Sequence, residues 1–229
     1  MGEAHLKRMA APRTWNVKRK GAKSITKPIP GPHNLHSGLP FATLLKEVLG
    51  KANTLADAKK IINSNEIKID GTARKNFRLP VGLFDTMEFA GTGECFRIVL
   101  NKKGKIDAVQ INKDEASFKP CKIIGKNMVK GKLQLNLYDG KNILVGNSGH
   151  NVGDTVLIKL PGQTITRHIK LDKKSTIFLT GGKHIGDVGK VEDIAESRIV
   201  YKNGEGNLIE TSKKYAFVIG DDKPSITVK

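Results

Sequence analysis

Residues 181–191 read GGKHIGDVGKV, a glycine-rich stretch with a lysine near its start. Because glycine-rich loops often bind phosphate, the first question is whether this one forms a P-loop. A P-loop needs a glycine, four further residues and then Gly-Lys-Ser/Thr, whose hydroxyl reaches a magnesium ion. Here His184 follows Lys183, and Ile177 stands where the first glycine belongs. The stretch therefore lacks two of the residues that a P-loop requires.

The segments on either side of the glycines argue against a dinucleotide site. Such a site places its glycines between a strand and a long helix. The preceding residues STIFLT (175–180) have the composition of a strand, but residues 190–208 show no sustained helical period and contain an Asn203-Gly204 turn signal. The sequence predicts strand, glycine loop, strand and turn, which is typical of a hairpin in a small β-barrel.

The glycines of this loop are predicted to serve backbone shape and close approach, because glycine reaches positive φ at no steric cost. Lys183 and Lys190 flank the turn, where they would reach phosphate. The alternative is a loop that serves the turn alone, since Asp187 at its tip repels phosphate. The loop glycines are Gly182, Gly186 and Gly189.

Net charge is the strongest signal in the composition. The 229 residues include 40 Lys and Arg against 22 Asp and Glu, a net charge of +18. This charge favours a polyanionic partner, namely nucleic acid, an anionic membrane or a heparin-like sugar; the alternative is a basic protein without a dedicated partner. Membrane binding would need an amphipathic helix or about 18 consecutive apolar residues, and we expect neither, nor a secretory signal. Nucleic acid is therefore the favoured partner.

The rare residue types indicate no metal and no cofactor. Cys95 and Cys121 are far apart and too few for a disulfide framework or a paired zinc knuckle, so we expect two reduced, half-buried thiols in a cytosolic protein. A single disulfide between them is the alternative. His33 and His36 have the spacing of some metal pairs, but no cysteine or carboxylate cluster lies beside them. We expect this pair to sit in a turn and donate to phosphate.

Residues 1–38 are interpreted as a basic N-terminal arm. The first thirty residues carry eight cations against one acid, Glu3, a net charge of +7. Prolines interrupt any long helix, and apolar residues are too few for the arm to order itself. We expect an extended segment that becomes ordered against phosphate. Its candidate contacts are Lys7, Arg8, Arg13, Lys18, Arg19, Lys20, Lys23, Lys27, His33 and His36.

Residues 39–94 are interpreted as a compact module of two helices and a hairpin. Apolar residues at helical spacing predict the first helix within LPFATLLKEVLG (39–50) and the second within NTLADAKKIINSN (53–65). Thr54 is the expected N-cap of the second helix, and Leu55 begins its buried stripe. The period then changes from 3.6 to two, which predicts a strand.

In that strand, Ile67 and Ile69 would face inward and Lys68 outward, and Asp70-Gly71 would turn the chain. Cations cluster along the second helix and this hairpin, with few acids nearby. Solvated lysines on a helix face are the alternative to a nucleic-acid contact. The clustered cations are Lys59, Lys60, Lys68, Arg74, Lys75 and Arg78.

The remaining residues are expected to be β structure. Short apolar runs broken by glycine and proline turns predict a small central β domain over residues 95–172, apart from one helical turn at NKDEA (112–116). Residues 173–220 hold the glycine loop and read as a second small barrel. Residues 221–229 form a short polar tail.

Two motifs resemble those of known RNA-binding modules. The stretch LADAKKIINSNEIKIDGTARKNFRLPVG (55–82) resembles the small module of S-four type, in which two helices and a strand place basic residues on one nucleic-acid face. Its hallmark strand stands here as IKIDG (67–71). The stretch GKHIGDVGKV (182–191) resembles the KOW motif of ribosomal and transcription-elongation proteins, whose domains are small SH3-like barrels.

The order of the segments is similar to one family over nearly the whole chain, the archaeal and eukaryotic small-subunit ribosomal protein family four-e. The similarity includes HLKRMAAPRTW (5–15), PCKI (120–123), TGGKHIGDVG (180–189) and FVIG (217–220). Eukaryotic members carry a longer C-terminal extension, so the resemblance is to archaeal members.

The resemblance implies a multidomain α+β fold: a basic extended N-terminal arm, a helix-helix-strand RNA-binding module, a small central β domain and an SH3-like KOW barrel. It implies a structural constituent of the small ribosomal subunit in the cytoplasm, with small-subunit rRNA and neighbouring ribosomal proteins as partners. No cofactor and no small-molecule substrate follow from it. On RNA, Trp15 would stack on an exposed base.

Two positions depart from the pattern of these modules. The second helix begins Leu55-Ala56-Asp57 where the bacterial module has Ser-Arg, so its phosphate contacts are expected to rely on Lys59, Lys60 and Arg74. Asp187 stands in the KOW loop where a basic or small residue is commoner. We therefore expect this loop to face protein as well as RNA.

Two other classes of function fit parts of the chain. An RNA-modifying enzyme can borrow an S-four-like module, as some pseudouridine synthases do, but it needs a catalytic domain that the remaining short strands do not suggest. A transcription-elongation module would use the KOW barrel on polymerase, and it leaves the S-four-like unit unexplained. We therefore expect a ribosomal protein that is not an enzyme and has no catalytic residues.

Overall fold

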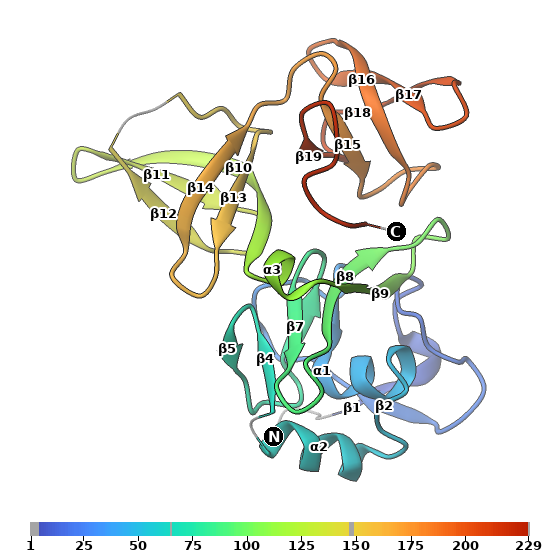
Figure 1. Ribbon diagram of the computed structural model, residues 1–229. Helices are drawn as coiled ribbons and strands as arrows, with labels where there is room; N and C mark the ends of the chain where they lie inside the picture. The colour runs from blue at the N-terminus through green and yellow to red at the C-terminus, as the bar shows by residue number, and fades with distance from the viewer. Residues whose placement is uncertain (1–4, 65, 147–148, 229) are drawn as a thin grey trace. The chain divides into compact units, whose positions relative to one another are not determined.

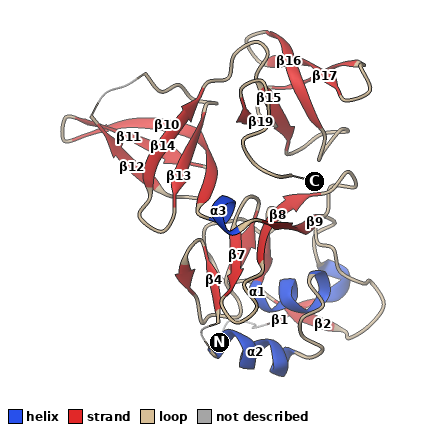
Figure 2. Cartoon of the chain, in the orientation of Figure 1, coloured by secondary structure: helices blue, strands red, loops and turns tan. Residues whose placement is uncertain are grey.

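The computed structural model describes residues 5–64, 66–146 and 149–228. Glu3 and the outermost residues of the predicted arm and tail lie outside these ranges. The chain is mostly β with few helices, and it divides into two compact units (Figures 1 and 2). The first unit comprises Met1–Asn101 and Lys105–Ser117, and the second comprises Lys102–Gly104 and Phe118–Lys229.

A five-stranded antiparallel sheet in the order β5-β4-β7-β8-β9 forms the centre of the first unit. A domain boundary between residues 94 and 95 is incompatible with this sheet, because β8 pairs with β7 from Thr86–Arg97 to Glu88–Cys95. The division between the compact units falls at Ser117 and Phe118 instead. The strands are β4 (Ile67–Ile69), β5 (Thr72–Ala73), β7 (Thr86–Phe89), β8 (Cys95–Leu100) and β9 (Ile106–Ile111).

Local signals in the sequence placed the helices of this unit correctly. The first predicted helix forms as α1 (Phe41–Thr43) continued by the π turn η2 (Leu44–Val48). The second forms as α2 (Leu55–Asn63), with the capping box of Thr54 and Asp57 confirmed. Leu55 is 42% exposed, so the buried stripe of α2 starts one turn later than predicted. The turn in NKDEA forms as α3 (Lys113–Ala116).

The basic arm is folded as part of the first unit, and the expectation of an extended arm is therefore wrong. Strand β1 (His5–Lys7) leads into the short helix η1 (Arg8–Ala10) and pairs with β2 (Ser24–Thr26). Trp15 is 2% exposed and belongs to the core. The composition argument failed because one indole buries far more apolar surface than an average residue. Nearby, β3 (Gly38–Pro40) pairs with β6 (Pro80–Gly82).

The second unit contains two five-stranded antiparallel sheets. The first has the order β12-β11-β10-β13-β14 and a core centred on Ile123, Leu135 and Val156. Its strands are β10 (Phe118–Val129), β11 (Lys132–Leu137), β12 (Asn142–Val145), β13 (Thr155–Lys159) and β14 (Thr164–Ile169). The second has the order β18-β17-β16-β15-β19. Its strands are β15 (Thr176–Leu179), β16 (Val188–Ile194), β17 (Arg198–Asn203), β18 (Leu208–Ser212) and β19 (Ala216–Gly220).

The two sheets of the second unit share apolar contacts. Ile169 of β14 belongs to the core cluster of the second sheet, and Leu157 and Leu171 pack against that cluster. A polar contact joins them as well: the Nζ of Lys122 in β10 donates to the carbonyl oxygens of Lys214 at 3.0 Å and Ala216 at 2.6 Å. The second sheet is therefore fastened to the first by both apolar packing and hydrogen bonds.

The predicted sequence of strand, glycine loop, strand and turn is confirmed. Strand β15 pairs antiparallel with β16 across the loop, and β16 pairs with β17. No helix follows the glycines in this part of the described chain. The loop therefore lacks the helix N-terminus on which a dinucleotide site would rest a pyrophosphate.

Candidate nucleic-acid interface

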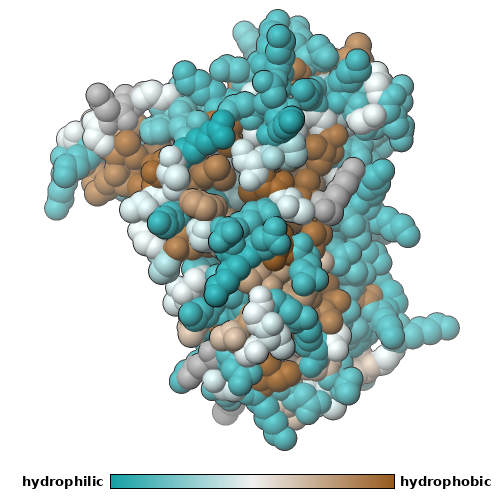
Figure 3. Space-filling model, viewed as in Figure 1, coloured by the Kyte–Doolittle hydropathy of each residue, from teal (hydrophilic) through white to brown (hydrophobic). Residues whose placement is uncertain are grey.

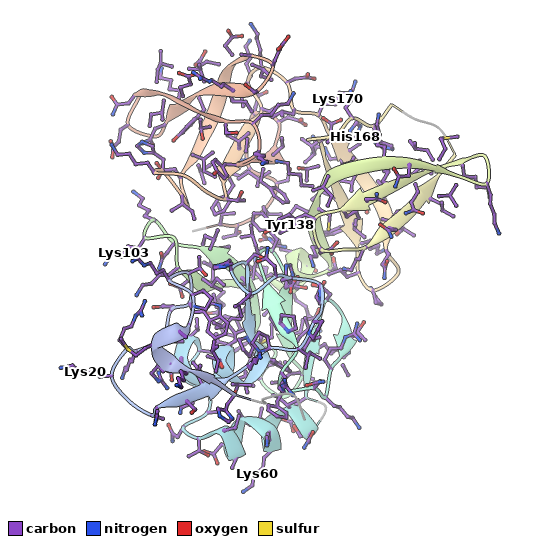
Figure 4. The ribbon with its side chains drawn as sticks, turned by 180° about the vertical axis from the view of Figure 1, so that it is seen from behind. Lys20, Lys60, Lys103, Tyr138, His168 and Lys170 are labelled. Atoms are coloured by element: carbon purple, nitrogen blue, oxygen red, sulfur yellow. The ribbon has the colours of Figure 1, made fainter. Side chains whose placement is uncertain are left out.

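Most of the predicted contacts in the first unit lie at the protein surface. In the described part of the chain, none of these exposed cations forms an ion pair with a carboxylate. Lys20 and Lys60 project outward from the ribbon (Figure 4). A surface cation without an ion pair can neutralise a phosphate. The exposed set, here called the first-unit cations, comprises Lys7, Arg13, Lys18, Arg19, Lys20, Lys23, Lys27, Lys59, Lys60, Lys68, Arg74 and Lys75.

Two further predicted contacts of the first unit, His36 and Arg78, are at least partly exposed. His36 is exposed, and its backbone N–H donates to the Asn34 side chain at 3.0 Å. Arg78 is half-buried, and its Nε donates to the carbonyl oxygen of Lys27 at 3.0 Å. Arg78 therefore fastens the arm at Lys27 while it remains partly exposed.

Three predicted contacts are buried, and the structure corrects their assignment. Trp15 is 2% exposed, so its ring has no face free to stack on a base. Arg8 is 6% exposed, and its guanidinium bonds Glu47 at 3.0 Å as well as two backbone carbonyl oxygens. His33 is 6% exposed, and its Nε2 lies 2.9 Å from Asp85. Polar atoms of all three side chains bond to groups inside the protein.

The hairpin after α2 turns where the sequence placed its turn. Asp70 and Gly71 both have positive φ, 51° and 72°, which is the geometry of a tight two-residue hairpin. Ile67 and Ile69 are buried and Lys68 is exposed, as predicted. Lys68 stands opposite Glu88 of β7 in the sheet, which offsets part of its charge.

A cavity of about 310 Å³ in the first unit is lined in part by cations. Its walls include the apolar side chains of Leu55 and Phe77 and the cations Lys46 and Lys59. The Nζ of Lys59 lies 4.4 Å from the centroid of the Phe77 ring, a cation–π contact. Lys59 is thus held at one place on the surface rather than freely solvated.

The glycines of the loop have the two roles that the sequence suggested. Gly182 and Gly186 have positive φ, 86° and 81°, which side chains rarely adopt. Gly189 lies in β16, where an added Cβ would stand 2.5 Å from the carbonyl oxygen of Lys202. The loop is therefore shaped by backbone geometry, and each glycine has a steric reason to be glycine.

The two lysines of this loop differ in their surroundings. Lys183 is exposed and, within the described residues, forms no ion pair. The Nζ of Lys190 lies 4.0 Å from a carboxylate oxygen of Asp222. Asp187 is half-buried and 3.7 Å from His184 rather than projecting at the tip. Lys183 is therefore the loop cation best placed to meet a polyanion.

Sequence reasoning missed a group of residues on the far side of the same loop. Tyr215 is 41% exposed and packs against the backbone of Gly181 and Gly182, with Lys213 and Lys214 immediately before it. The signal was present as KKY at residues 213–215, an aromatic residue behind two lysines in a turn. Sequence alone does not show that Tyr215 meets the glycine loop, because Gly181 lies 34 residues before it in the chain.

Both cysteines are free and buried, so the prediction of half-buried thiols underestimated their burial. Burial, together with the nearby charge of Glu88, raises the pKa of the Cys95 thiol. Cys121 lies 3.6 Å from Asp139, which also bonds the ammonium groups of Lys119 and Lys141 at 3.1 Å each. Burial tends to raise the pKa of Asp139, but the two lysines outweigh it and hold that pKa below its ordinary value.

Among the residues that the structure describes, no three His, Cys, Asp or Glu side chains are grouped as a metal ion would need. No helix in the described ranges is long and apolar enough to span a membrane. Hydrophilic side chains predominate on the face drawn in Figure 3. Exposed apolar residues of the chain include Ile124 and Met128 of β10 and Leu144 of β12.

Comparison with known proteins identifies the family. The family model "Ribosomal family S4e" matches residues 92–165, and the "RS4NT (NUC023) domain" model matches residues 2–36. The small ribosomal subunit protein eS4 of Methanothermobacter thermautotrophicus is 38% identical over 98% of this chain and 95% of its own length. That of Aeropyrum pernix is 37% identical over 99% of this chain and 96% of its own.

A solved structure agrees with these sequence matches. The crystal structure of the 30S ribosomal protein S4e from Thermoplasma acidophilum superposes with a TM-score of 0.69 at 25% identity, covering 84% of this chain and 98% of that one. Sequence identity well above 30% over nearly full length leaves a single assignment. The chain belongs to the eS4 family of small ribosomal subunit proteins.

Proposed function

We propose that this protein is a structural constituent of the small ribosomal subunit, where it binds small-subunit rRNA and supports assembly and translation. The observation that carries the proposal is full-length identity of 36–38% to small-subunit eS4 proteins. The net charge of +18 and the unpaired first-unit cations suit this role. Such a protein works without turnover, in the cytoplasm on the ribosome.

The finer assignments of the two RNA-binding modules are part of the proposal. The pair of helices η2 and α2, followed by the β4–β5 hairpin, acts as an S-four-like module. The sheet of β15–β19 acts as a KOW barrel, with the glycine loop between β15 and β16 as its RNA-facing loop. The order of these segments along the chain supports both assignments.

The mechanism of binding is neutralisation of phosphates by many weak contacts. Each first-unit cation that meets a phosphate releases a condensed counterion, and this entropy gain drives association. Phosphate contacts fix the register of the protein on the RNA, while the folded shape of the RNA supplies specificity. Because Arg8 and Trp15 are locked in the core, the exposed cations around β1 and β2 are held on a folded surface.

Two measurements test the proposal in order. In a lysate of the source cells, the full-length protein is expected to sediment with small ribosomal subunits. Binding to purified small-subunit rRNA is then followed against salt, and log Kd is expected to rise steeply with log[salt], by about 0.7–0.9 per phosphate contact. A protein that sediments away from small subunits, or that binds rRNA with no salt dependence, contradicts the proposal. Co-sedimentation with RNA polymerase instead would favour the transcription-elongation alternative.

A further inference from the structure

Tyr215 is the exposed aromatic residue of the described chain. Its side chain is 41% exposed, whereas Trp15 is buried and the other described phenylalanines and tyrosines are buried or half-buried. Tyrosine combines an apolar ring with a polar hydroxyl and is enriched at interfaces, so the outer face of this ring is a candidate contact. The question is which partner fits this ring.

The inner side of the Tyr215 ring packs against two glycines of the loop. A Cβ added at Gly181 would lie 2.5 Å from Cδ1 and 2.7 Å from Cε1 of the ring, closer than real Cβ atoms approach. A Cβ at Gly182 would lie 3.6 Å from Cδ2 and 3.8 Å from Cε2. The ring thus covers the Gly181–Gly182 backbone, and only glycine at position 181 permits that contact. Its exposed area lies on the outer side.

The backbone that carries Tyr215 is fixed by hydrogen bonds. Its carbonyl oxygen accepts from the backbone N–H of Thr180 at 2.9 Å and from the Thr180 hydroxyl at 3.0 Å, and its N–H donates to Ser212 at 3.0 Å. The ammonium group of Lys122 donates to the carbonyl oxygens on both sides, at Lys214 and Ala216. The ring is therefore held in place before any ligand arrives, which lowers the entropy cost of binding.

Three lysines belong to the two chain segments that meet at this ring. Lys213 and Lys214 precede it in the chain, and Lys183 follows the two glycines on which it rests. Proteins hold unpaired nucleotides by combining an aromatic ring, on which the base stacks, with basic side chains that meet the backbone phosphates. An apolar peptide would gain nothing from the three lysines, so charge favours the nucleotide.

We propose that Tyr215 is a stacking platform for an unpaired RNA base, with Lys183, Lys213 and Lys214 as its phosphate contacts. The inference rests on the proposed rRNA binding and adds to it the kind of nucleotide that the glycine-loop face takes. It also gives the glycine pair a function: Gly181 lets the ring settle flat on the loop, so that its outer face presents a level surface to the base.

The test uses the full-length protein and two RNA hairpins that differ only by one bulged 2-aminopurine. Stacking tolerates every base, so this generic probe is adequate. We expect the wild type to bind the bulged hairpin more tightly and to quench its 2-aminopurine fluorescence. Tyr215→Leu should weaken binding of the bulged hairpin roughly tenfold, remove the quenching and leave binding of the paired hairpin unchanged. Tyr215→Phe should retain both.

Two further variants separate stacking from folding. Gly181→Ala should reduce quenching while Tyr215 is still present, because the added methyl group displaces the ring. Leu208→Ala is the matched control, a 66% exposed apolar residue of the same sheet, and should change nothing. If Tyr215→Leu keeps the wild-type melting temperature and binds and quenches the bulged hairpin as the wild type does, the platform does not exist, although rRNA binding stands. If the wild type binds neither hairpin at low salt, the proposed function itself fails.

Discussion

The indole Nε1 of Trp15 donates a 2.9 Å hydrogen bond to the carbonyl oxygen of Leu35. This bond joins two parts of the basic arm that are 20 residues apart in the sequence. The indole itself is buried in the core. The arm is consequently a folded surface that carries exposed cations.

Trp15→Phe is expected to lower the free energy of unfolding by about 1–3 kcal/mol, because the Leu35 carbonyl loses its buried donor. Denaturant unfolding measures this change. RNA affinity, measured well below the melting temperature, should be unchanged because Trp15 is buried. An unchanged stability together with weakened RNA binding would restore the stacking role for Trp15.

Replacing Lys18, Arg19, Lys20 and Lys23 together by Gln should flatten the salt dependence of rRNA binding by about 0.7–0.9 for each side chain that meets a phosphate. All four are exposed, so the fold should be retained. Binding titrations at several salt concentrations give the slope. Lys51→Gln serves as a control, because the Lys51 ammonium is already paired with Glu94 at 2.5 Å. An unaltered slope in the fourfold variant means that this part of the arm does not touch RNA.

Lys60→Ala combined with Arg74→Ala should weaken rRNA binding while changing the free energy of unfolding by no more than about 0.5 kcal/mol, as is usual for surface substitutions. Both side chains are exposed and unpaired in the described structure. Binding and thermal unfolding are measured on the same preparation. A large loss of stability that accounts for the loss of binding would show that these residues are structural.

Lys183→Ala and Gly186→Val separate the two roles of the glycine loop. Gly186 is buried with φ of 81°, so a branched side chain there should destabilise the second unit whether or not RNA is near. Lys183→Ala should leave the melting temperature unchanged and reduce subunit retention in a high-salt wash. Retention equal to that of the wild type would place the loop away from RNA, against protein or solvent.

Asp139 should contribute to the pH dependence of stability. Its pKa is lowered in the folded state, since the Lys119 and Lys141 ammonium groups outweigh the effect of burial. A lowered folded pKa gives stability that is present above the unfolded value, near 3.8, and is lost as pH falls through the folded value. Asp139→Asn should therefore flatten the acid limb of the stability curve.

The same variant removes a carboxylate that pairs with the buried Lys119, so at pH 7 it should cost about 3–5 kcal/mol. Urea unfolding at pH 7 and pH 3 measures both effects. Asp193→Asn is the control, because Asp193 is 65% exposed in its pair with Lys173. If Asp139→Asn and Asp193→Asn lower the free energy of unfolding equally at pH 7, the buried cluster around Asp139 contributes no more to stability than the exposed pair of Asp193.

Features that depend on neighbouring residues could be predicted from the sequence. The capping box of Thr54 and Asp57, the turn at Asp70-Gly71 and the hairpin around the glycine loop each rest on a local pattern. Alternation and helical spacing report which face of a segment is buried, and they do so without knowledge of the partner.

Features that depend on distant partners could not be predicted in this way. The burial of Trp15 requires Leu35, the pairing of Arg8 requires Glu47, and the contact of Tyr215 with Gly181 joins segments that are far apart in the chain. Composition averaged over the arm suggested disorder, although a few long-range contacts are enough to fold it. Most of the predicted phosphate contacts are exposed and stay predictions, whereas Arg8 is buried because its guanidinium is bonded inside the protein.

The backbone bond from the N–H of Ile106 to the carbonyl oxygen of Thr14, 2.7 Å long, has a consequence for synthesis. Thr14 leaves the translating ribosome early, yet its partner is made about 90 residues later, a delay of roughly 5–20 s at ordinary elongation rates. During that interval the N-terminal residues cannot complete their native contacts. Released chains that end before Ile106 should therefore be digested by protease at their N-terminus. Released chains that extend past α3 should be protected.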